Sequence, residues 1–455
     1  MKKLILFIFL LSFLNSFAQC FTNVLTRQNH NVAKKDDGTL WVWGWGVWGQ
    51  LGDVNGTDSN SPNQLSNDND WNKITSGTFN TFVIKNNGSL WGTGRNQNGD
   101  LGINSNTNIY ELTQVGTANN WKKVSGGDLH TVGIKTDGTI WAWGWNYYHQ
   151  VGDNTTIDRL VPVQISTTSD WKTIETTLYG PSFALKYNGT LWGWGPNGPG
   201  LLGDSLLNYR AIPTQHNTDT DWNDFVLGGN HILALKNNGT LWSWGGTDRG
   251  ETGDGPASIF RYVPAQIGTD NDWKFIAAGE FNSFGIKNNG TLWAWGFNDA
   301  GQLGNGNTTT QYYPIQIGTD TNWASVNSGY QHTVALKTDG SLWAWGNNDF
   351  GQLGDGTNVS TLIPTQISVA GCNLGNEEFE NNNNFSINPN PAQNTITITT
   401  QQTINEIKIY NTLGQLVQTT TGNTKTLDVS QLKSGNYFLK IGYDGIVSSE
   451  RFIKE

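Results

Sequence analysis

Charged residues are scarce in this 455-residue chain. They make up only 14% of it, the formal net charge is −10, and no run of Lys or Arg is present. This excludes nucleic acid as the expected partner, because such a partner requires a basic field. The N-terminal apolar run, Leu4–Leu14, is shorter than the ~20 residues of a membrane span, so we do not expect an integral membrane protein. No Ser-His-Asp arrangement and no convergent acid–base pair can be argued, and we therefore expect no enzyme and no cofactor.

Glycine and tryptophan are abundant instead, with 56 and 22 residues. Tight turns alternating with bulky strand residues favour an all-β chain. Residues 1–19 resemble a signal peptide: Lys2 and Lys3 precede the apolar run, and small residues stand at Ser16 and Ala18. Cys20 raises the alternative of a lipoprotein, but Gln19 stands where lipid attachment requires a small residue. We expect a secreted or outer cell-surface protein.

A repeat of about 50 residues runs through most of the chain. It is marked by Trp71, Trp121, Trp171, Trp222, Trp273 and Trp323, with Phe21 in the same slot one period earlier. Each of the seven repeats also contains Lys, any residue, Asp/Asn, Gly, Thr/Ser, Leu/Ile, Trp, as in Lys135–Trp141. Asp-Gly or Asn-Gly between apolar residues predicts a hairpin in which both central residues take positive φ. About four short strands per repeat predict a seven-bladed β-propeller over residues 20–372, with an open solenoid as the rival.

The two cysteines, Cys20 and Cys372, argue for the closed ring. They are 352 residues apart, or seven repeats, and each directly precedes the position of a leading aromatic. In a closed ring these positions coincide, whereas in a solenoid they lie at opposite ends. Since export favours oxidation, we predict a Cys20–Cys372 disulfide that fastens the ring.

The repeats resemble those of the regulator of chromosome condensation family, in which Gly-Gly-x-x-His-Thr/Ser precedes an apolar strand, Asp-Gly and Trp-x-Trp-Gly. Repeat three matches through residues 124–134, and repeat seven through Gly329, His332 and Thr333. The resemblance implies a seven-bladed propeller but no single activity, since the fold serves exchange factors, a light receptor, ligase-associated modules and a β-lactamase inhibitor. Neither the wedge of the exchange factor nor the Trp before the motif His of the light receptor is present. Repeat four departs at Gly180-Pro181-Ser182, which puts its first hairpin in doubt.

The repeats stop at Cys372. Residues 373–384 read as a polar linker, and residues 385–455 show short alternating runs that suggest a small β-sandwich. This segment resembles the type A sorting domain of the type IX secretion system through residues 388–391, 409–415, 427–430, 435–438 and 451–455. The resemblance implies that residues 385–455 engage the type IX secretion machinery after export to the periplasm.

Recurrent His and Asp residues occupy fixed slots of the repeat. His30, His130, His231 and His332 share one slot, and we expect them to form structural hydrogen bonds, because a metal site needs ligands that converge from different positions. Carboxylates at turns usually cap backbone N–H groups, so we expect no metal; cations along one rim and calcium at three acidic pairs are the alternatives. The turn residues are Asp53, Asp153, Asp204, Asp254 and Asp355, and the pairs are Asp68/Asp70, Asp219/Asp221 and Asp270/Asp272.

Residues that break the repeat are the candidate binding residues. One slot follows Trp-x-Trp-Gly, and the other precedes a Pro-containing segment; we expect each slot to form a circle of loop residues on one face. Aromatic and Arg side chains are enriched in interface hot spots. The candidates are Trp45, Trp48, Trp145, Tyr147, Tyr148, Tyr209, Arg210, Arg249, Phe260, Arg261, Tyr262, Tyr312 and Tyr313, with Tyr110 and Arg159 in the same slots. The alternative is that these rings pack over their own turns.

We therefore expect a binding propeller that recognises an extracellular protein through loop-decorated faces. A glycan-binding adhesin is the second hypothesis, because exposed Trp and Tyr stack on sugars. A polymer-degrading enzyme is the third.

Overall fold

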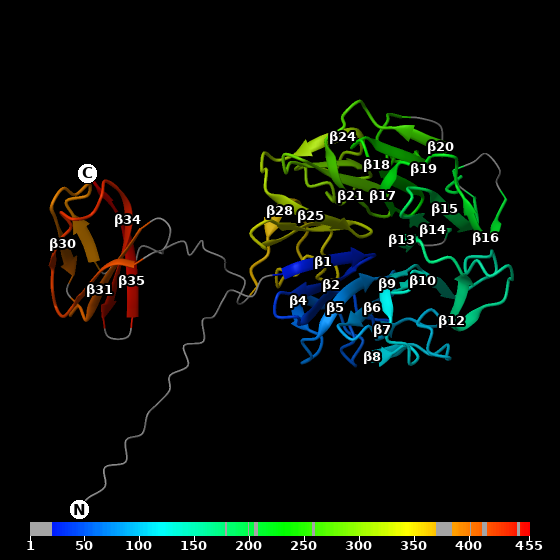
Figure 1. Cartoon of the computed structure of the whole chain (residues 1–455), viewed down its shortest axis with the longest axis horizontal. Helices are drawn as coiled ribbons and strands as arrows, with labels where there is room; N and C mark the ends of the chain where they lie inside the picture. The colour runs from blue at the N-terminus through cyan, green and yellow to red at the C-terminus, as the bar shows by residue number, and fades with distance from the viewer. Residues whose placement is uncertain are drawn as a thin grey trace, which may run out of the picture. The chain divides into compact units, whose positions relative to one another are not determined.

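The structure is a computed structural model that describes residues 21–177, 180–198, 200–203, 208–256, 260–369, 385–400, 402–411, 416–443 and 446–455. These residues form two compact units, with strands β1–β28 in the first and β29–β35 in the second (Figure 1). The predicted signal peptide, both cysteines and the predicted linker lie outside the described residues.

The first unit consists of seven sheets, each made of four consecutive antiparallel strands. The first strands are β1 (Phe21–Arg27), β5 (Trp71–Ser76), β9 (Trp121–Gly126), β13 (Trp171–Thr176), β17 (Trp222–Leu227), β21 (Trp273–Ala278) and β25 (Trp323–Ser328). The second strands are β2 (His30–Lys35), β6 (Asn80–Lys85), β10 (His130–Lys135), β14 (Ser182–Lys186), β18 (His231–Lys236), β22 (Asn282–Lys287) and β26 (His332–Lys337).

The third strands carry a Leu/Ile-Trp-x-Trp-Gly signature, except β7, which reads Leu-Trp-Gly-Thr-Gly, and the fourth strands form the outer edges. The third strands are β3 (Leu40–Gly44), β7 (Leu90–Gly94), β11 (Ile140–Gly144), β15 (Leu191–Gly195), β19 (Leu241–Gly246), β23 (Leu292–Gly296) and β27 (Leu342–Gly346). The fourth strands are β4 (Ser59–Gln64), β8 (Ile109–Gln114), β12 (Arg159–Ser166), β16 (Arg210–Gln215), β20 (Phe260–Gln266), β24 (Gln311–Ile317) and β28 (Thr361–Gln366).

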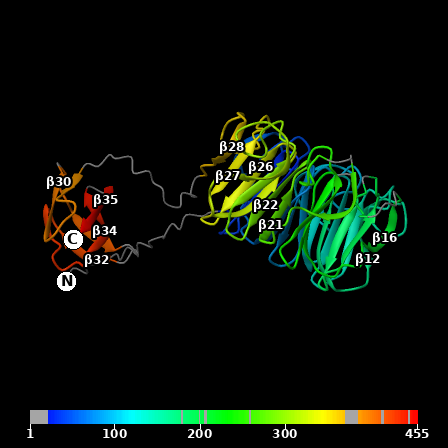
Figure 2. The same ribbon diagram turned by 90° about the horizontal axis from the view of Figure 1, so that it is seen from above.

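The seven sheets form a closed ring. The first strands of neighbouring sheets contact one another around the centre, and β1 contacts β25 and β26 of the last sheet (Figure 1). The fourth strands, such as β12 and β16, lie at the periphery (Figure 2). The predicted seven-bladed propeller is confirmed, and the solenoid alternative is wrong. We number the blades in chain order.

Tryptophan packing explains the repeat. The leading aromatic packs edge-to-face on the first Trp of Trp-x-Trp in its own blade, as in Trp121 and Trp141, whose ring centroids are 6.3 Å apart. The second Trp is fully buried and reaches the preceding blade, where Trp143 Nε1 donates to the Asp100 carbonyl at 2.8 Å. Replacing a buried Trp by Ala costs roughly 3–5 kcal/mol, so these residues hold both blades and ring together.

The Asp-Gly turns differ from the prediction. Gly138 has φ +80°, but Asp137 is not among the described residues with positive φ. Gly138 N donates to the Lys135 carbonyl, and Lys135 N donates to the Thr139 carbonyl, which is a type I turn followed by a left-handed glycine. The Asp137 carboxylate accepts from Thr139 N and Oγ1, and the same hydroxyl accepts from Trp141 Nε1. The Asp/Asn before the glycine is therefore explained by these linked side-chain hydrogen bonds and not by a need for positive φ.

Blade 4 retains its first hairpin despite the deviating sequence. Strands β13 and β14 pair antiparallel from Trp171 with Lys186 to Thr176 with Ser182. The doubt raised by Gly180-Pro181-Ser182 is thus removed, because the extra residue is taken up in the loop.

The ring closes between blade 7 and blade 1 with the same contacts that join other blades. Trp43 Nε1 and Asn31 Nδ2 both donate to the Gln352 carbonyl, at 3.1 and 2.9 Å. Phe21 and Val369 belong to one buried cluster at this seam. These two residues are the nearest described neighbours in sequence of the two cysteines, so the seam brings the ends of the repeat region together.

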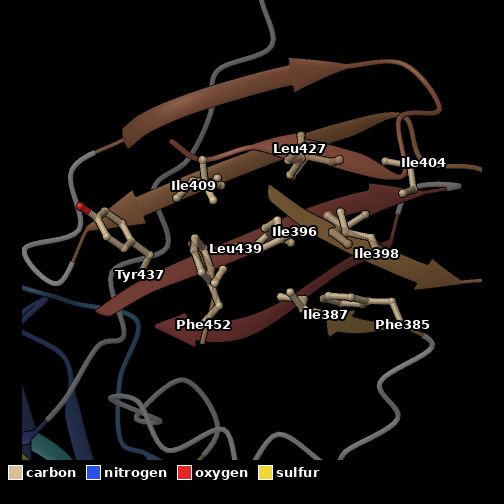
Figure 3. Packing of buried hydrophobic residues seen from close by; sticks show 14 residues of the cluster. Phe385, Ile387, Ile396, Ile398, Ile404, Ile409, Leu427, Tyr437, Leu439 and Phe452 are labelled. Atoms are coloured by element: carbon tan, nitrogen blue, oxygen red, sulfur yellow. The ribbon is translucent and has the colours of Figure 1, made fainter. Parts of the chain in front are cut away.

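The second unit is a sandwich of two antiparallel sheets, as predicted. One sheet has the order β29-β30-β33 and the other β32-β31-β34-β35. Their strands are β29 (Phe385–Asn388), β30 (Thr395–Thr400), β31 (Glu406–Asn411), β32 (Leu416–Thr421), β33 (Thr426–Asp428), β34 (Gly435–Tyr443) and β35 (Ile446–Lys454). Alternating side chains from both sheets, such as Ile396, Ile409 and Leu439, fill the core between them (Figure 3).

Candidate functional site

The four repeat histidines are structural, as expected. All four are buried, and each Nε2 lies within hydrogen-bond distance of a hydroxyl in the next blade. His130 Nε2 is 2.8 Å from Ser182 Oγ and 2.6 Å from Thr176 Oγ1, and His332 Nε2 is 2.8 Å from Thr26 Oγ1 across the seam. Burial lowers the pKa of His30 to about 4 and the pKa values of His130, His231 and His332 to about 3. The imidazoles are therefore neutral links between blades at physiological pH.

The turn aspartates cap backbone groups. Asp53 Oδ1 accepts from Gly56 N at 3.0 Å, Asp153 Oδ1 from Thr155 N at 3.0 Å, and Asp355 Oδ1 from Thr357 N at 2.9 Å. Asp254 accepts from the Thr252 hydroxyl and pairs with Arg261, whereas Asp204 lies outside the described residues.

The acidic pairs proposed as calcium fragments have a different partner. Lys85 Nζ lies 2.6 Å from Asp68 and 3.1 Å from Asp70, and the same arrangement recurs at Lys236 and Lys287. Each ammonium also stands over a Trp ring, as Lys85 does over Trp71 at 4.6 Å. Across the described part of the chain, no group of three or more His, Cys, Asp and Glu side chains is arranged to hold a metal ion.

The candidates before the Pro-containing segment do not form a loop circle. Tyr209 directly precedes β16, and the remainder start the outer strands β8, β12, β16, β20 and β24. Here they pack on glycines of the preceding blade: a methyl group on Gly49 would lie 2.9 Å from Tyr110 Cδ1, one on Gly200 2.4 Å from Tyr262 Cδ1, and one on Gly250 3.2 Å from Tyr312 Cδ1. The prediction of a circle of loop residues is therefore wrong for this slot, because periodic phase alone does not tell a loop from an edge strand.

Several of these side chains are occupied by internal contacts. Arg159 and Arg261 pair with the turn carboxylates Asp153 and Asp254 of their own blades. The Tyr313 hydroxyl lies over Gly255 of the preceding blade, and Phe260 packs beside Tyr262. Arg210 is the first residue of β16 and is half-buried.

The other slot does lie in loops. The loops that join third to fourth strands lie beside those that join first to second strands; for example, Trp45 N donates to the Asn29 carbonyl and Trp145 N to the Leu129 carbonyl. We call the end of the blades that carries both sets of loops the loop face. Its aromatic residues form three groups: one in the blade 1 loop around Trp45, one around Phe281 of blade 6 and one in the blade 3 loop around Trp145.

The blade 1 loop is packed into its neighbours. Trp45 contacts Phe79 of blade 2 and Phe350 of blade 7, with ring centroids 5.8 and 5.7 Å apart, and Trp48 contacts Phe79 at 6.2 Å. The Arg95 guanidinium stacks on Phe79 from the other side at 4.9 Å. Arg249 of blade 5 is likewise held, 3.9 Å above the Phe281 ring of blade 6.

The blade 3 loop is exposed. Trp145 stacks on Tyr147 and meets Tyr148 edge-to-face, while His149 stacks on Tyr209 of blade 4 at 4.5 Å. Tyr147, Tyr148 and Tyr209 have 62%, 46% and 59% of their surface exposed. These five residues form what we call the aromatic patch, which spans two blades.

The centre of the ring holds a cavity that the sequence did not predict. It has a volume of about 570 Å³ and is lined by residues of all seven first strands, among them Arg27, Lys73, Lys123, Glu175 and Asp224. The signal that could have found it is the alternation of each first strand, in which positions three and five face away from the blade core. Read across the repeats, those positions collect charged residues such as Lys73 and Glu175 together with apolar ones such as Phe275 and Val226.

No helix in the described ranges has the length and apolar character required to cross a bilayer.

Comparison with protein families identifies both units. Residues 37–84, 137–176, 289–336 and 339–378 match the regulator of chromosome condensation (RCC1) repeat, and a second description of that repeat matches 121–150, 223–251, 273–302 and 323–352. Residues 386–455 match the secretion system C-terminal sorting domain. Among curated proteins, none matches the chain in sequence.

Solved structures with the same fold include human WBSCR16 and yeast RCC1. WBSCR16 is 20% identical over 73% of this chain and 94% of its own, with a TM-score of 0.66. Yeast RCC1 (Prp20), solved with Kap60, is 18% identical over 82% of this chain and 88% of its own, also at 0.66. Prp20p from Saccharomyces cerevisiae is 18% identical over 82% and 90%, at 0.64. The chain thus belongs to the regulator of chromosome condensation repeat family, as a seven-bladed propeller followed by a secretion-system C-terminal sorting domain.

Proposed function

We propose that this protein is an exported binding module that recognises an extracellular protein through the aromatic patch of blades 3 and 4. The observation that carries the proposal is the exposure of Tyr147, Tyr148 and Tyr209 beside Trp145 on a rigid scaffold. Exposed apolar clusters are uncommon on monomers without a partner, and Tyr and Trp dominate interface hot spots. The C-terminal sorting domain supports an extracellular setting for that partner.

Three of the other candidates, Trp45, Trp48 and Arg249, support this choice by contrast. Trp45 and Trp48 are engaged by Phe79 and Phe350, and Arg249 is engaged by Phe281 and Phe297. Binding through them would require breaking contacts that already bury their surfaces, whereas the aromatic patch meets a partner without rearrangement.

Affinity capture from the extracellular medium tests the proposal. The full chain is immobilised as wild type, as the double variant Tyr147→Ala/Tyr148→Ala and as Tyr187→Ala. Tyr187 is a matched control, because it is 65% exposed but lies in the turn between β14 and β15, on the opposite end of the blade. We expect a protein that is retained by wild type and Tyr187→Ala and lost from the double variant. Equal retention by all three would refute the assignment.

Glycan binding is the second candidate, favoured by the exposed ring of Tyr147, which lies parallel to Trp145 within 9°. On a glycan array, binding that is abolished by Trp145→Ala, without capture of any protein, would favour it. Trp45→Ala tests whether the blade 1 loop contributes to glycan binding. Because Trp45 is packed between blades, we expect this substitution to leave array binding unchanged.

A further inference from the structure

Arg27 crosses one end of the central cavity, next in sequence to Gln28, whose Nε2 donates to Glu280 Oε2 of blade 6 at 3.1 Å. In the slot six residues after the leading aromatic, five blades carry glycine, and blade 1 carries Arg27. The glycines are Gly77, Gly127, Gly228, Gly279 and Gly329. Arg27 donates to the Gly126 carbonyl of blade 3 at 3.4 Å and to the Thr176 carbonyl of blade 4 at 2.8 Å. The guanidinium therefore reaches across the ring and is fixed there by two other blades.

The walls of the cavity are divided. Leu25, Val226, Phe275 and Ala277, from blades 1, 5 and 6, give an apolar side. Blades 2 to 4 contribute Lys73, Lys123 and the side chains around them, which give a polar side. A ligand that fits both sides has an apolar body and a polar head.

The charges of the lining favour an anionic head. Five lining residues are basic (Arg27, Lys73, Lys122, Lys123 and Lys172), and three are acidic (Glu175, Asp224 and Glu280). Burial raises the pKa of Glu280 to about 7 and also raises the pKa values of Glu175 and Asp224, so the acids oppose the cations weakly. The cavity is thus locally positive in a chain whose net charge is −10.

One cation in the cavity is uncommitted. Lys122 Nζ contacts the Tyr187 hydroxyl at 2.9 Å, Lys123 Nζ lies 3.4 Å from Glu175, and Lys172 Nζ contacts the Asn223 carbonyl at 2.5 Å. The Lys73 side chain, by contrast, makes no hydrogen bond or ion pair with any residue that the structure describes, although it lines the cavity. Because Lys73 is exposed, a charge-assisted bond to a ligand would replace the water around its ammonium.

We propose that the central cavity binds a small organic anion, a carboxylate or a phosphate with an apolar body, and that Lys73 holds its charged head. The apolar body lies against Leu25, Val226 and Phe275. This site is independent of the aromatic patch, which lies in the loops of blades 3 and 4.

Isothermal titration calorimetry on the full chain at low salt tests this with three probes that share a six-carbon alkyl chain: heptanoate, hexyl phosphate and hexylamine. We expect at least one anion to bind and the amine not to bind; which anion binds more tightly assigns the head group. Lys73→Gln should weaken anion binding about tenfold, and Lys73→Arg should restore most of it. Lys274→Gln is the matched control, because Lys274 is exposed on first strand β21 and does not line the cavity.

Three results would overturn the proposal. They are the absence of binding by both anions at millimolar concentration, binding of hexylamine as tight as that of the anions, and equal weakening by Lys73→Gln and Lys274→Gln. Because Lys73 is exposed and unpaired, its replacement is not expected to disturb folding, which the melting temperature of each variant checks. Tyr147→Ala should leave anion binding unchanged, so this test and that of the proposed partner fail separately.

Discussion

Blades 1 and 3 carry aromatic residues in the same loop slot, yet those of blade 1 are packed between blades and those of blade 3 are exposed. Trp45 and Trp48 are packed between blades 7, 1 and 2, whereas Tyr147 and Tyr148 stand exposed above blade 3. Both loops begin with a half-buried Trp, Trp45 or Trp145, and expose the residue two positions later, Val47 or Tyr147. What differs is the neighbour, because Phe79 and Phe350 flank the blade 1 loop on both sides.

The position of blade 1 in the ring gives the difference a physical meaning. Its loop stands at the seam, where residues about 300 positions apart in sequence must meet. Closing so long a loop costs conformational entropy, which additional packing at the seam offsets. Blade 3 is joined to its neighbours by continuous chain and needs no such reinforcement, which leaves Tyr147 and Tyr148 exposed.

The largest expected effect at the seam belongs to the two cysteines. We predict that Cys372→Ser, or reduction of the wild type, lowers the free energy of unfolding by about 5 kcal/mol on the chain-entropy account. Chemical denaturation with and without reductant measures the loss, and Cys372→Ser in the presence of reductant is the control, since it should match reduced wild type. Two free sulfhydryls in a thiol count on the unreduced protein would show that no such bond exists.

Phe79→Ala has the next largest effect. Its ring contacts Trp45, Trp48 and the Arg95 guanidinium, so its removal should lower the free energy of unfolding by about 2 kcal/mol. Tyr147→Ala, in the exposed loop, should change it by less than about 0.5 kcal/mol. Urea denaturation of both variants compares the loops directly. Similar decreases in the free energy of unfolding for both variants would mean that the blade 3 loop also stabilises the ring by packing and does not differ from the blade 1 loop.

The smallest effect concerns the histidines below the loops, where blades 1 and 3 are alike. Burial holds the pKa of His130 at about 3, below its ordinary value of 6.5, so the unfolded chain binds the proton first. The stability that this neutral imidazole contributes is present above pH 6.5 and is lost as the pH falls towards 3. His130→Asn, the residue that blades 2 and 6 carry in this slot, should reduce the loss between pH 7.5 and pH 5 by about 1–2 kcal/mol.

Denaturation curves at both pH values measure that change. His30→Asn should behave in the same way, because its pKa is also lowered, to about 4. An unchanged pH dependence in both variants would show that these histidines are not responsible for acid sensitivity. A change in only one would show that the two blades differ below the loops as well as above them.

Much of the fold could be predicted because the same strand and turn pattern recurs in seven repeats. The spacing of the leading aromatics, the hairpin motif and Phe21 as the first member all correspond to strands in the structure. The second unit was predictable from alternation, since Ile396, Ile398, Ile407 and Ile409 are all buried. Local patterns suffice for these features, because each strand buries the same face in every blade.

Other predictions failed where the pattern is compatible with two geometries. Asp-Gly suits two kinds of hairpin turn, and the hydrogen bonds of Lys135 and Thr139 show that the type I turn with a left-handed glycine is used. Tyr110 and Tyr312 were placed in loops, whereas they begin outer strands and cover glycines of the preceding blade. Both errors arise because spacing gives the position of a residue within the repeat but not the residues that it contacts in the folded blade.

The number of blades and the strands within each blade can be predicted from the sequence, because they depend on contacts that recur in every blade, and the family of each unit follows from its local motifs. Which aromatic loops are exposed, and the crossing of a charged cavity by Arg27, are seen only in the folded ring. Those features depend on side chains that break the repeat and meet across the ring, such as Arg27 and Thr176, which lie 149 residues apart. No local pattern specifies such a meeting, since it follows from the closure of the whole ring.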